Sequence, residues 1–351
     1  MHMADALLSP AVGAAMWAAS AGTIAYCSSK VRKERDDSRI PLMGVLGAFI
    51  FAAQMINFTI PVTGSSGHLG GGLILAILLG PYAAFLTIAS VLVVQALFFA
   101  DGGLLALGCN IFNLGFFPAF IACPLIYKRI IGRQPTAARI SLASTAAAII
   151  GLQLGAFSVV LETVSSGISS LPFATFSAIM QPIHLAIGVV EGLVTAAVVS
   201  FVYKVRPEIL NSALMPRPIW NQPMRNIVLA FLAAAVVTAG FFSWFASKNP
   251  DGLEWSITTV TGQDELKGPE QGLHATLAAL QERTAFLADY SIKKSADTKR
   301  ETLQPETARP AQKPEKHAET GLAGLAGGSL TLGIVFLIGL LLKRSTYFGP
   351  H

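Results

Sequence analysis

The stretch GGLILAILLGPYAAFLTIASVLVVQALFFA, residues 71–100, decides how this chain folds. It carries no charged residue and is broken only at Gly80-Pro81. A helix of about 20 apolar residues crosses the hydrocarbon core of a membrane, whereas a Gly-Pro pair ends or sharply kinks a helix. The stretch is therefore either one kinked membrane span or a short re-entrant arm followed by a full span.

The rest of the chain is equally apolar. Of its 351 residues, 53% are hydrophobic and 13% are charged, and the mean hydropathy is +0.58. A soluble domain has about 25% charged residues, so this chain has too few polar residues to cover a compact surface, which excludes a soluble globular protein. Comparable apolar stretches occur at about 8–27, 40–60, 104–127, 140–161, 182–204, 226–246 and 328–342.

The basic residues set the predicted topology. The formal net charge is +5, and 15 of the 25 Lys and Arg residues lie at the ends of apolar stretches, while the other ten lie in 247–327. The clusters at the ends of apolar stretches favour contact with membrane lipid and give no reason to expect nucleic acid as a partner. If 71–80 and 82–100 cross separately, the clusters at 30–39, 128–139, 204–225 and 343–344 all fall on the cytoplasmic side, and the loops at 61–70, 101–103 and 162–181, which contain no Lys or Arg, fall outside. We therefore expect an all-α integral membrane protein of the cell (inner) membrane, with a seven-helix bundle followed by two further membrane helices.

This topology divides the chain into three parts. Residues 1–205 form a transmembrane domain with an external N-terminus, and residues 206–225 form a cytoplasmic Pro-rich linker. Residues 226–351 contain spans at about 226–246 and 328–342, an external segment 247–327 and a cytoplasmic C-terminus. Within that segment, 270–290 has helical periodicity, while 293–320 has a composition typical of flexible chain. The N-terminus lacks the basic region of a cleavable signal, so we expect Met1 to be retained.

Two histidines are predicted to share the external face, His2 at the chain's start and His68 in the loop TGSSGHLGGG. The amine of Met1, the amide nitrogen of His2 and its Nδ1 can wrap one ion, and His68 can add a fourth nitrogen. Such an all-nitrogen, square-planar site suits Ni(II) or Cu(II), with Ni(II) ahead of Co(II) in affinity. A histidine at position 2 and a Gly-rich turn also occur without any metal, and the spacing alone leaves both interpretations open.

Other polar residues are candidates for supporting this site. The glycines at 64, 67, 70, 71 and 72 would let the N-terminal segment approach closely. Polar groups in membrane spans usually face the bundle interior, where they could hold the histidine rings or join helices by hydrogen bonds. The cysteines, Cys27, Cys109 and Cys123, lack metal-ligand spacing and are interpreted as core residues. The candidates for holding the rings are Asn57, Gln95, Asp101, Asn110, His184 and Glu191.

Two absences bear on function. No G-x-x-x-x-G-K-[ST] loop occurs, so an ATP-driven step would need another subunit, and no H-E-x-x-H motif of a zinc protease is found. These absences count against a nucleotide-hydrolysing enzyme and against an intramembrane zinc protease, so we expect a chain that is not an enzyme.

Three segments resemble a known family. MHMADALLSP (1–10), PVTGSSGHLGGGLILAILLGPYAAF (61–85) and VQALFFADGGLLALGCNIFNLG (94–115) resemble the substrate-capture (S) component of energy-coupling-factor nickel and cobalt transporters, the NikM/CbiM type. The resemblance covers about 1–205. NPDGLEWS (249–256) resembles the PDGLE-type companion component, NikN, over about 225–345. Where family members commonly have Pro and Gly around the first aspartate, this chain has Met3-Ala4-Asp5-Ala6.

The resemblance implies a function and partners. It implies an S-component-like bundle in which Met1, His2 and His68 bind the metal, working with a transmembrane coupling (T) component and two ATPase subunits. We expect an importer subunit that captures Ni(II) outside the cell, with a Co(II) homologue feeding cobalamin synthesis as the alternative. Asp251 and Glu254 would attract metal or would simply be surface acids at a turn.

Two alternative functions from other classes of protein remain open. A secondary permease working alone is less favoured because the H-x-x-x-x-D-H pattern is absent. A membrane-anchored receptor or assembly protein would use 247–327 to bind a partner.

Overall fold

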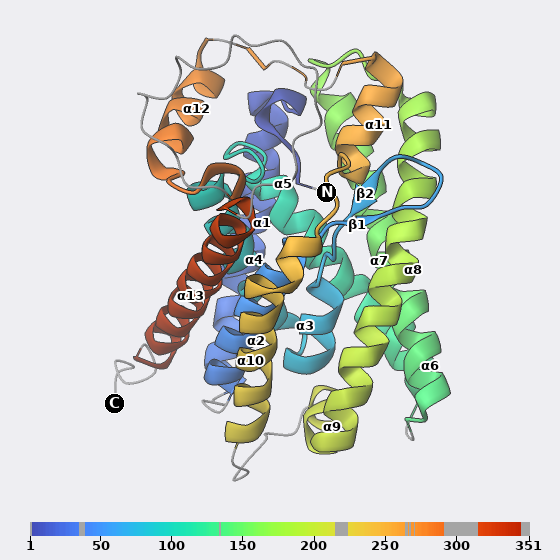
Figure 1. The fold of residues 1–351 in the computed structure, drawn as a ribbon, viewed down its shortest axis with the longest axis vertical. Coiled ribbons are helices and arrows are strands. Elements are labelled where there is room, and N and C mark those ends of the chain that lie inside the picture. Colours follow the sequence, from blue (N-terminus) through green and yellow to red (C-terminus); the bar gives the residue numbers. More distant parts are fainter. Residues whose placement is uncertain are drawn as a thin grey trace.

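The computed structural model describes residues 2–34, 39–132, 135–214, 224–263, 266, 268–269, 271–290 and 315–344. Figure 1 shows a bundle of long helices that run roughly side by side, with the short helices α11 (Gly252–Thr261) and α12 (Leu273–Thr284) at one end and α9 (Pro207–Leu214) at the other. The expected Met1 ligand lies outside the described residues, as do residues 215–223 of the expected linker and 293–314 of the segment expected to be flexible.

The chain is mostly helical. The first part contains η1 (Asp5–Leu7), α1 (Pro10–Glu34), α2 (Arg39–Gln54), the strands β1 (Phe58–Thr59) and β2 (Ser66–Gly67), α3 (Gly72–Leu79), α4 (Pro81–Phe99), α5 (Leu107–Ile111), the π-helix η2 (Phe112–Tyr127), α6 (Lys128–Ile131), α7 (Ala137–Ser166) and α8 (Phe173–Val205). The second part contains α9 (Pro207–Leu214), α10 (Arg225–Gly240), η3 (Phe242–Phe245), α11 (Gly252–Thr261), α12 (Leu273–Thr284), η4 (Ala288–Tyr290) and α13 (Glu315–Arg344).

Within the described residues, five helical stretches are long and apolar enough to span a membrane: 81–99, 107–131, 137–166, 173–205 and 319–342. Two shorter apolar helices, α2 and α10, lie beside them. Large apolar side chains such as Leu142, Leu193 and Leu337 are exposed on the outside of the bundle, where lipid would cover them. The prediction of a multi-pass helical membrane protein is thus confirmed, whereas the number of nine crossings stays a prediction.

The expected third crossing is built differently from a simple helix. With eight residues, α3 extends only about 12 Å and cannot cross a core of about 30 Å alone. The preceding residues 65–71 are all buried, so the second half of the loop expected outside at 61–70 lies within the bundle. At the other end, Gly80 has a φ of 81° and lets the chain turn into α4, which begins at Pro81.

The second part packs against the first along α2. Both α10 and α13 contact α2, and the three helices run side by side in Figure 1. Glycines of α13 make this close approach possible, because a Cβ added at Gly327 would lie 2.0 Å from the Phe51 ring and one at Gly339 would lie 2.4 Å from Ile40. Small residues that let helix backbones approach are typical of packing within membranes.

Several expected boundaries shift. The expected linker 206–225 begins with helix α9, and the loop expected at 162–181 shrinks to residues 167–172 because α7 and α8 are longer than their apolar cores. Helix α13 begins at Glu315, so 315–320 is helical and not flexible, and the last helix extends well before 328. The helix expected within 270–290 is confirmed as α12. All three cysteines are buried and free, as expected.

Candidate metal centre

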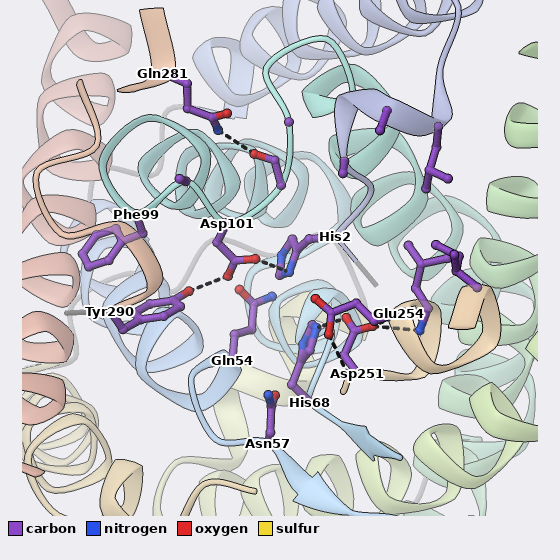
Figure 2. Close-up of a pocket in the computed structure, with 18 of the residues that line it drawn as sticks. His2, Gln54, Asn57, His68, Phe99, Asp101, Asp251, Glu254, Gln281 and Tyr290 are labelled. Atoms are coloured by element: carbon purple, nitrogen blue, oxygen red, sulfur yellow. Dashed lines mark hydrogen bonds and ion pairs between the residues drawn. The ribbon is translucent and has the colours of Figure 1, made fainter. Parts of the chain in front are cut away.

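The imidazole rings of His2 and His68 lie face to face. Their centroids are 5.0 Å apart and the ring planes differ by 8°. Each side chain is only 7% exposed. The structure thus brings these distant histidines together, while their place on the external face and their role as metal ligands stay predictions. Figure 2 shows both rings projecting into a common pocket.

His2 is positioned by the docking of the N-terminal segment onto the turn after α4. Met3 donates its N–H to Asn110 Oδ1 at 2.8 Å and accepts the N–H of Gly103 at 2.9 Å. The Asp5 carboxylate accepts the N–H of Ala106 at 2.9 Å, while Met3 and the apolar Leu7 are buried. These bonds leave the residues next to His2 little freedom to move.

Glycine permits this docking. A Cβ at Gly103 would lie 1.9 Å from Asp5 Oδ1, and one at Gly102 would lie 3.4 Å from His2 Cβ. The glycines that were expected to make room for the N-terminal segment lie against other parts of the chain. Gly67, Gly70 and Gly72 approach Ile187, Glu191 and Leu114 instead. The sequence prediction selected the wrong glycines because nothing local indicates which neighbour a buried loop will meet.

His68 follows strand β2, and its loop is held from two helices. The Glu191 carboxylate on α8 accepts the N–H groups of Gly70 and Gly71 at 2.9 and 3.1 Å. Gln54 donates to the Gly70 carbonyl at 2.8 Å, and Gln95 donates to Gln54 Oε1 at 2.8 Å. The residues next to His68 are thus fixed by buried polar contacts, which are costly to break.

The ring of His68 is prepared to act as a ligand. Its Nδ1 lies 3.1 Å from the Leu69 carbonyl oxygen, which can only accept a hydrogen bond, so Nδ1 carries the proton and Nε2 presents a lone pair. Burial, helped by the neighbouring His2, lowers the pKa of His68 to about 3. The ring is therefore neutral at pH 7, the form that binds metals.

Each histidine faces one carboxylate. His2 Nδ1 lies 3.1 Å from Asp101 Oδ1, and His68 Nε2 lies 4.0 Å from Asp251 Oδ2, a distance too long for a hydrogen bond. Burial raises the pKa of both carboxyls, but nearby positive charge outweighs it, at Asp101 chiefly that of His2, and both pKa values lie below normal. Two negative charges therefore lie beside the histidine pair.

Asp251 is held rigidly in this position. Its Oδ1 accepts the N–H groups of Leu253 and Glu254 at 2.8 and 2.9 Å and so caps α11, while Glu254 accepts the N–H of Asp251 in return. Ser66 donates its N–H to the Pro250 carbonyl at 2.8 Å, which joins this segment to the strand preceding His68. The predicted turn with two acids is thus a reciprocal helix cap that leaves Oδ2 facing the histidines.

These groups line a cavity of about 550 Å³ between the first part of the chain and residues 251–290. Among its lining residues are His2, His68, Asp101, Asp251, Glu254 and Tyr290 (Figure 2). Within the described residues, no group of three or more His, Cys, Asp or Glu side chains is placed to hold a metal ion. A metal here would therefore need ligands beyond these side chains, as the expected chelate through backbone nitrogens does.

One detail differs from the expected chelate. The nitrogen of His2 expected to bind metal, Nδ1, contacts Asp101, while Nε2 is buried and has no hydrogen-bond partner in the part of the chain that the structure describes. Binding through Nδ1 requires the ring to exchange its contact with Asp101 for one with the ion.

The six candidates for holding the rings act in different ways. Asp101 contacts the His2 ring directly. Three of the others fix the backbone next to the histidines: Asn110 bonds Met3, which follows His2, while Glu191 and, through Gln54, Gln95 hold the loop after His68. The Asn57 side chain lines the cavity. His184 donates its Nδ1–H to the Met180 carbonyl at 2.8 Å, its Nε2 has no hydrogen-bond partner among the described residues, and it lines a void of about 10 Å³ with His68.

Sequence reasoning missed the contribution of residues 281–290. Gln281 donates to the carbonyls of Ala96 and Gly102 at 2.9 and 2.7 Å, and Tyr290 donates to Asp101 Oδ2 at 2.5 Å. No motif marks either residue. Their partners are more than 170 positions away, and only the tertiary fold brings them together.

Comparison with known proteins gives consistent matches. The family described as the cobalt uptake substrate-specific transmembrane region, CbiM, matches residues 2–209, and the PDGLE domain matches residues 225–344. A putative fused nickel transport protein NikMN of Archaeoglobus fulgidus is 30% identical over 70% of this chain and 77% of that protein. The cobalt transport protein CbiM of Sorangium cellulosum is 28% identical over 60% of this chain and 95% of that protein. The crystal structure of a truncated transition metal transporter is similar with a TM-score of 0.52 and 29% identity, over 58% of this chain and 99% of that one.

Proposed function

Because the chain belongs to the cobalt uptake substrate-specific transmembrane family, and is thus a membrane component of nickel or cobalt transport, we propose that it captures Ni(II) at the external face for ATP-driven import. The observation that carries this proposal is the stacked, buried pair of His2 and His68, with a carboxylate facing each ring. Burying charged groups costs free energy, so two carboxylates beside a histidine pair are not expected if the pair serves only packing.

The proposed ligands are four nitrogens: the amine of Met1, the amide and Nδ1 of His2, and Nε2 of His68. The first three form fused chelate rings, and the neutral ring of His68 completes the plane. The amide must lose its proton to bind, so loading releases protons. The resulting amide anion and the carboxylates of Asp101 and Asp251 place negative charge around the divalent ion, which favours its binding.

The donor set supports Ni(II) as cargo over Co(II). A planar arrangement of four nitrogens suits Ni(II), which also binds such ligands more tightly than Co(II). Relatives bear names for both nickel and cobalt transport, so Co(II) is the alternative cargo.

We further propose that the first part of the chain, 1–205, is the capture domain and that 226–351 is a companion domain covering it from outside. The basic clusters support a cytoplasmic C-terminus and an external metal site. ATP-driven uptake would then require a coupling T component and two ATPase subunits, since the sequence contains no phosphate-binding loop of its own. Uptake that proceeds in cells lacking those subunits would favour a stand-alone permease.

The test is calorimetric titration of the purified full chain with Ni(II). The proposal expects one site per chain, lost when His2 or His68 is replaced by alanine and kept when His351, at the other end of the sequence, is replaced. A yellow d–d absorption band would report planar Ni(II). Unchanged affinity in either His2→Ala or His68→Ala contradicts the proposal.

A further inference from the structure

The hydroxyl of Tyr290 reaches the metal centre from the other part of the chain. It donates to Asp101 Oδ2 at 2.5 Å, and the other oxygen of the same carboxylate lies 3.1 Å from His2 Nδ1. Figure 2 shows the three side chains in a row, with Asp101 in the middle. A residue of the region matched by the PDGLE domain is therefore one carboxylate away from a proposed metal ligand.

Tyr290 is held firmly in this place. Its ring stacks on Phe99 with centroids 5.0 Å apart and planes 30° apart, and its edge meets Phe51. The preceding Leu287 donates its N–H to the Phe98 carbonyl at 3.1 Å. Tyr290 also has a φ of 55°, a left-handed conformation that costs free energy for a residue with a bulky side chain. The fold thus maintains a strained backbone at the point where the hydroxyl reaches Asp101.

The Asp101 carboxylate, which lies between Tyr290 and His2, can fix the orientation of the His2 ring. A metal-bound histidine usually donates its second ring N–H to a carboxylate or carbonyl, which fixes the ring's orientation. If the His2 ring turns by 180° about Cβ–Cγ, Nε2 takes the position of Cε1, next to the atom that Asp101 contacts. Asp101 can therefore hold the ring through Nδ1 before loading and through Nε2–H once Nδ1 binds the ion.

We propose that Tyr290 is a positioning residue of the metal centre, which holds Asp101 in place and thereby sets how tightly His2 binds the ion. This inference rests on the proposed function. The proposed ligands alone assign no role to residues 271–290. With Tyr290 in this role, metal affinity depends on the docking of the second part of the chain on the first.

The test compares Tyr290→Phe, which keeps the ring and loses only the hydroxyl, with Tyr127→Phe. Tyr127 is also buried, and its hydroxyl has no partner within the described residues. In Ni(II) titrations of the full chain, Tyr290→Phe should weaken affinity about tenfold, a typical loss for such supporting contacts, whereas Tyr127→Phe should bind normally. Thermal unfolding verifies that both variants fold.

A double-mutant comparison separates positioning from general stabilisation. If Tyr290 acts through Asp101, Tyr290→Phe should cause no further loss in an Asp101→Asn background. Normal affinity in Tyr290→Phe, or losses that multiply in the double variant, would overturn the inference while leaving the proposed function intact. If the unchanged chain binds no Ni(II), the proposed function fails and this inference fails with it.

Discussion

The Glu191 carboxylate on α8 accepts the backbone N–H of Gly70, at 2.9 Å, two residues after His68. A second bond, from Gly71 at 3.1 Å, uses the other carboxylate oxygen. A side chain 121 positions further along the chain therefore holds the loop that carries a proposed ligand. The precision of the metal centre depends on such buried contacts as much as on the ligands themselves.

Replacing Glu191 by glutamine tests this anchor. The amide can accept only one of the two N–H bonds and turns its NH₂ group toward the other, so the loop should shift and Ni(II) affinity should fall about tenfold. Calorimetric titration measures the loss. Glu162→Gln is the control, because Glu162 is equally buried but bonds Asn113 and Ser158. Equal affinities in the two variants would argue against a role for the anchor.

Gly103→Ala should displace the N-terminal segment. The added Cβ would lie 1.9 Å from Asp5 Oδ1 and 2.5 Å from the Asp5 nitrogen, so the segment that carries His2 must move. We expect Ni(II) binding to be lost while the helical content in circular dichroism is kept. Gly22→Ala provides the matched control, since no atom lies within 4 Å of its added Cβ. Tight binding by Gly103→Ala would mean that His2 is not positioned in this way.

Gly327→Ala should weaken the packing of α13 on α2. The new methyl would lie 2.0 Å from the Phe51 ring, and overpacking of this kind costs about 1–3 kcal/mol. Thermal unfolding in detergent should therefore shift to lower temperature. Gly333→Ala on the same helix meets no atom within 4 Å and should not have this effect. Identical unfolding temperatures for the two variants would refute the packing argument.

Mild acid should destabilise the metal-free fold. Burial lowers the pKa of His68 from 6.5 to about 3, so between these values the unfolded chain binds a proton that the folded chain does not. The stabilisation is complete above about pH 6.5 and declines as the pH falls toward 3. Unfolding measured at pH 7.5 and pH 5 should show this loss, and His68→Gln should lose less. A variant with the same pH dependence as the unchanged chain would exclude His68 as the cause.

Much of the architecture could be predicted from sequence because membrane helices reveal themselves locally. The apolar run 81–99 indicates a span without reference to any neighbour, and the basic clusters at 30–39 and 128–139 indicate which loops face the cytoplasm. The prediction that the loop 61–70 lies outside the bundle was wrong for its second half, because tertiary contacts decide the burial of that segment. Burial of the loop 65–71 depends on α8 and α2, which supply Glu191 and Gln54 as polar partners, and no local pattern records those partnerships.

The candidate site could be predicted only in part, for a similar reason. His2 and His68 stand out because a histidine at the second position has a specific chelating chemistry. Asp101 was one of six polar candidates that sequence could not separate. Tyr290 could not have been found, because its importance comes from a hydroxyl placed next to Asp101 by the docking of residues 281–290 on α4.

In the proposed metal centre, the free amine of Met1 and the rings of His2 and His68 bind one ion together. The most direct measurement is Ni(II) titration of the purified chain against a version extended by a single glycine before Met1. The account predicts one tight site and a yellow planar Ni(II) band for the unextended chain, and loss of both in the extended chain, which still folds. Tight binding with the same spectrum in the extended chain would contradict it.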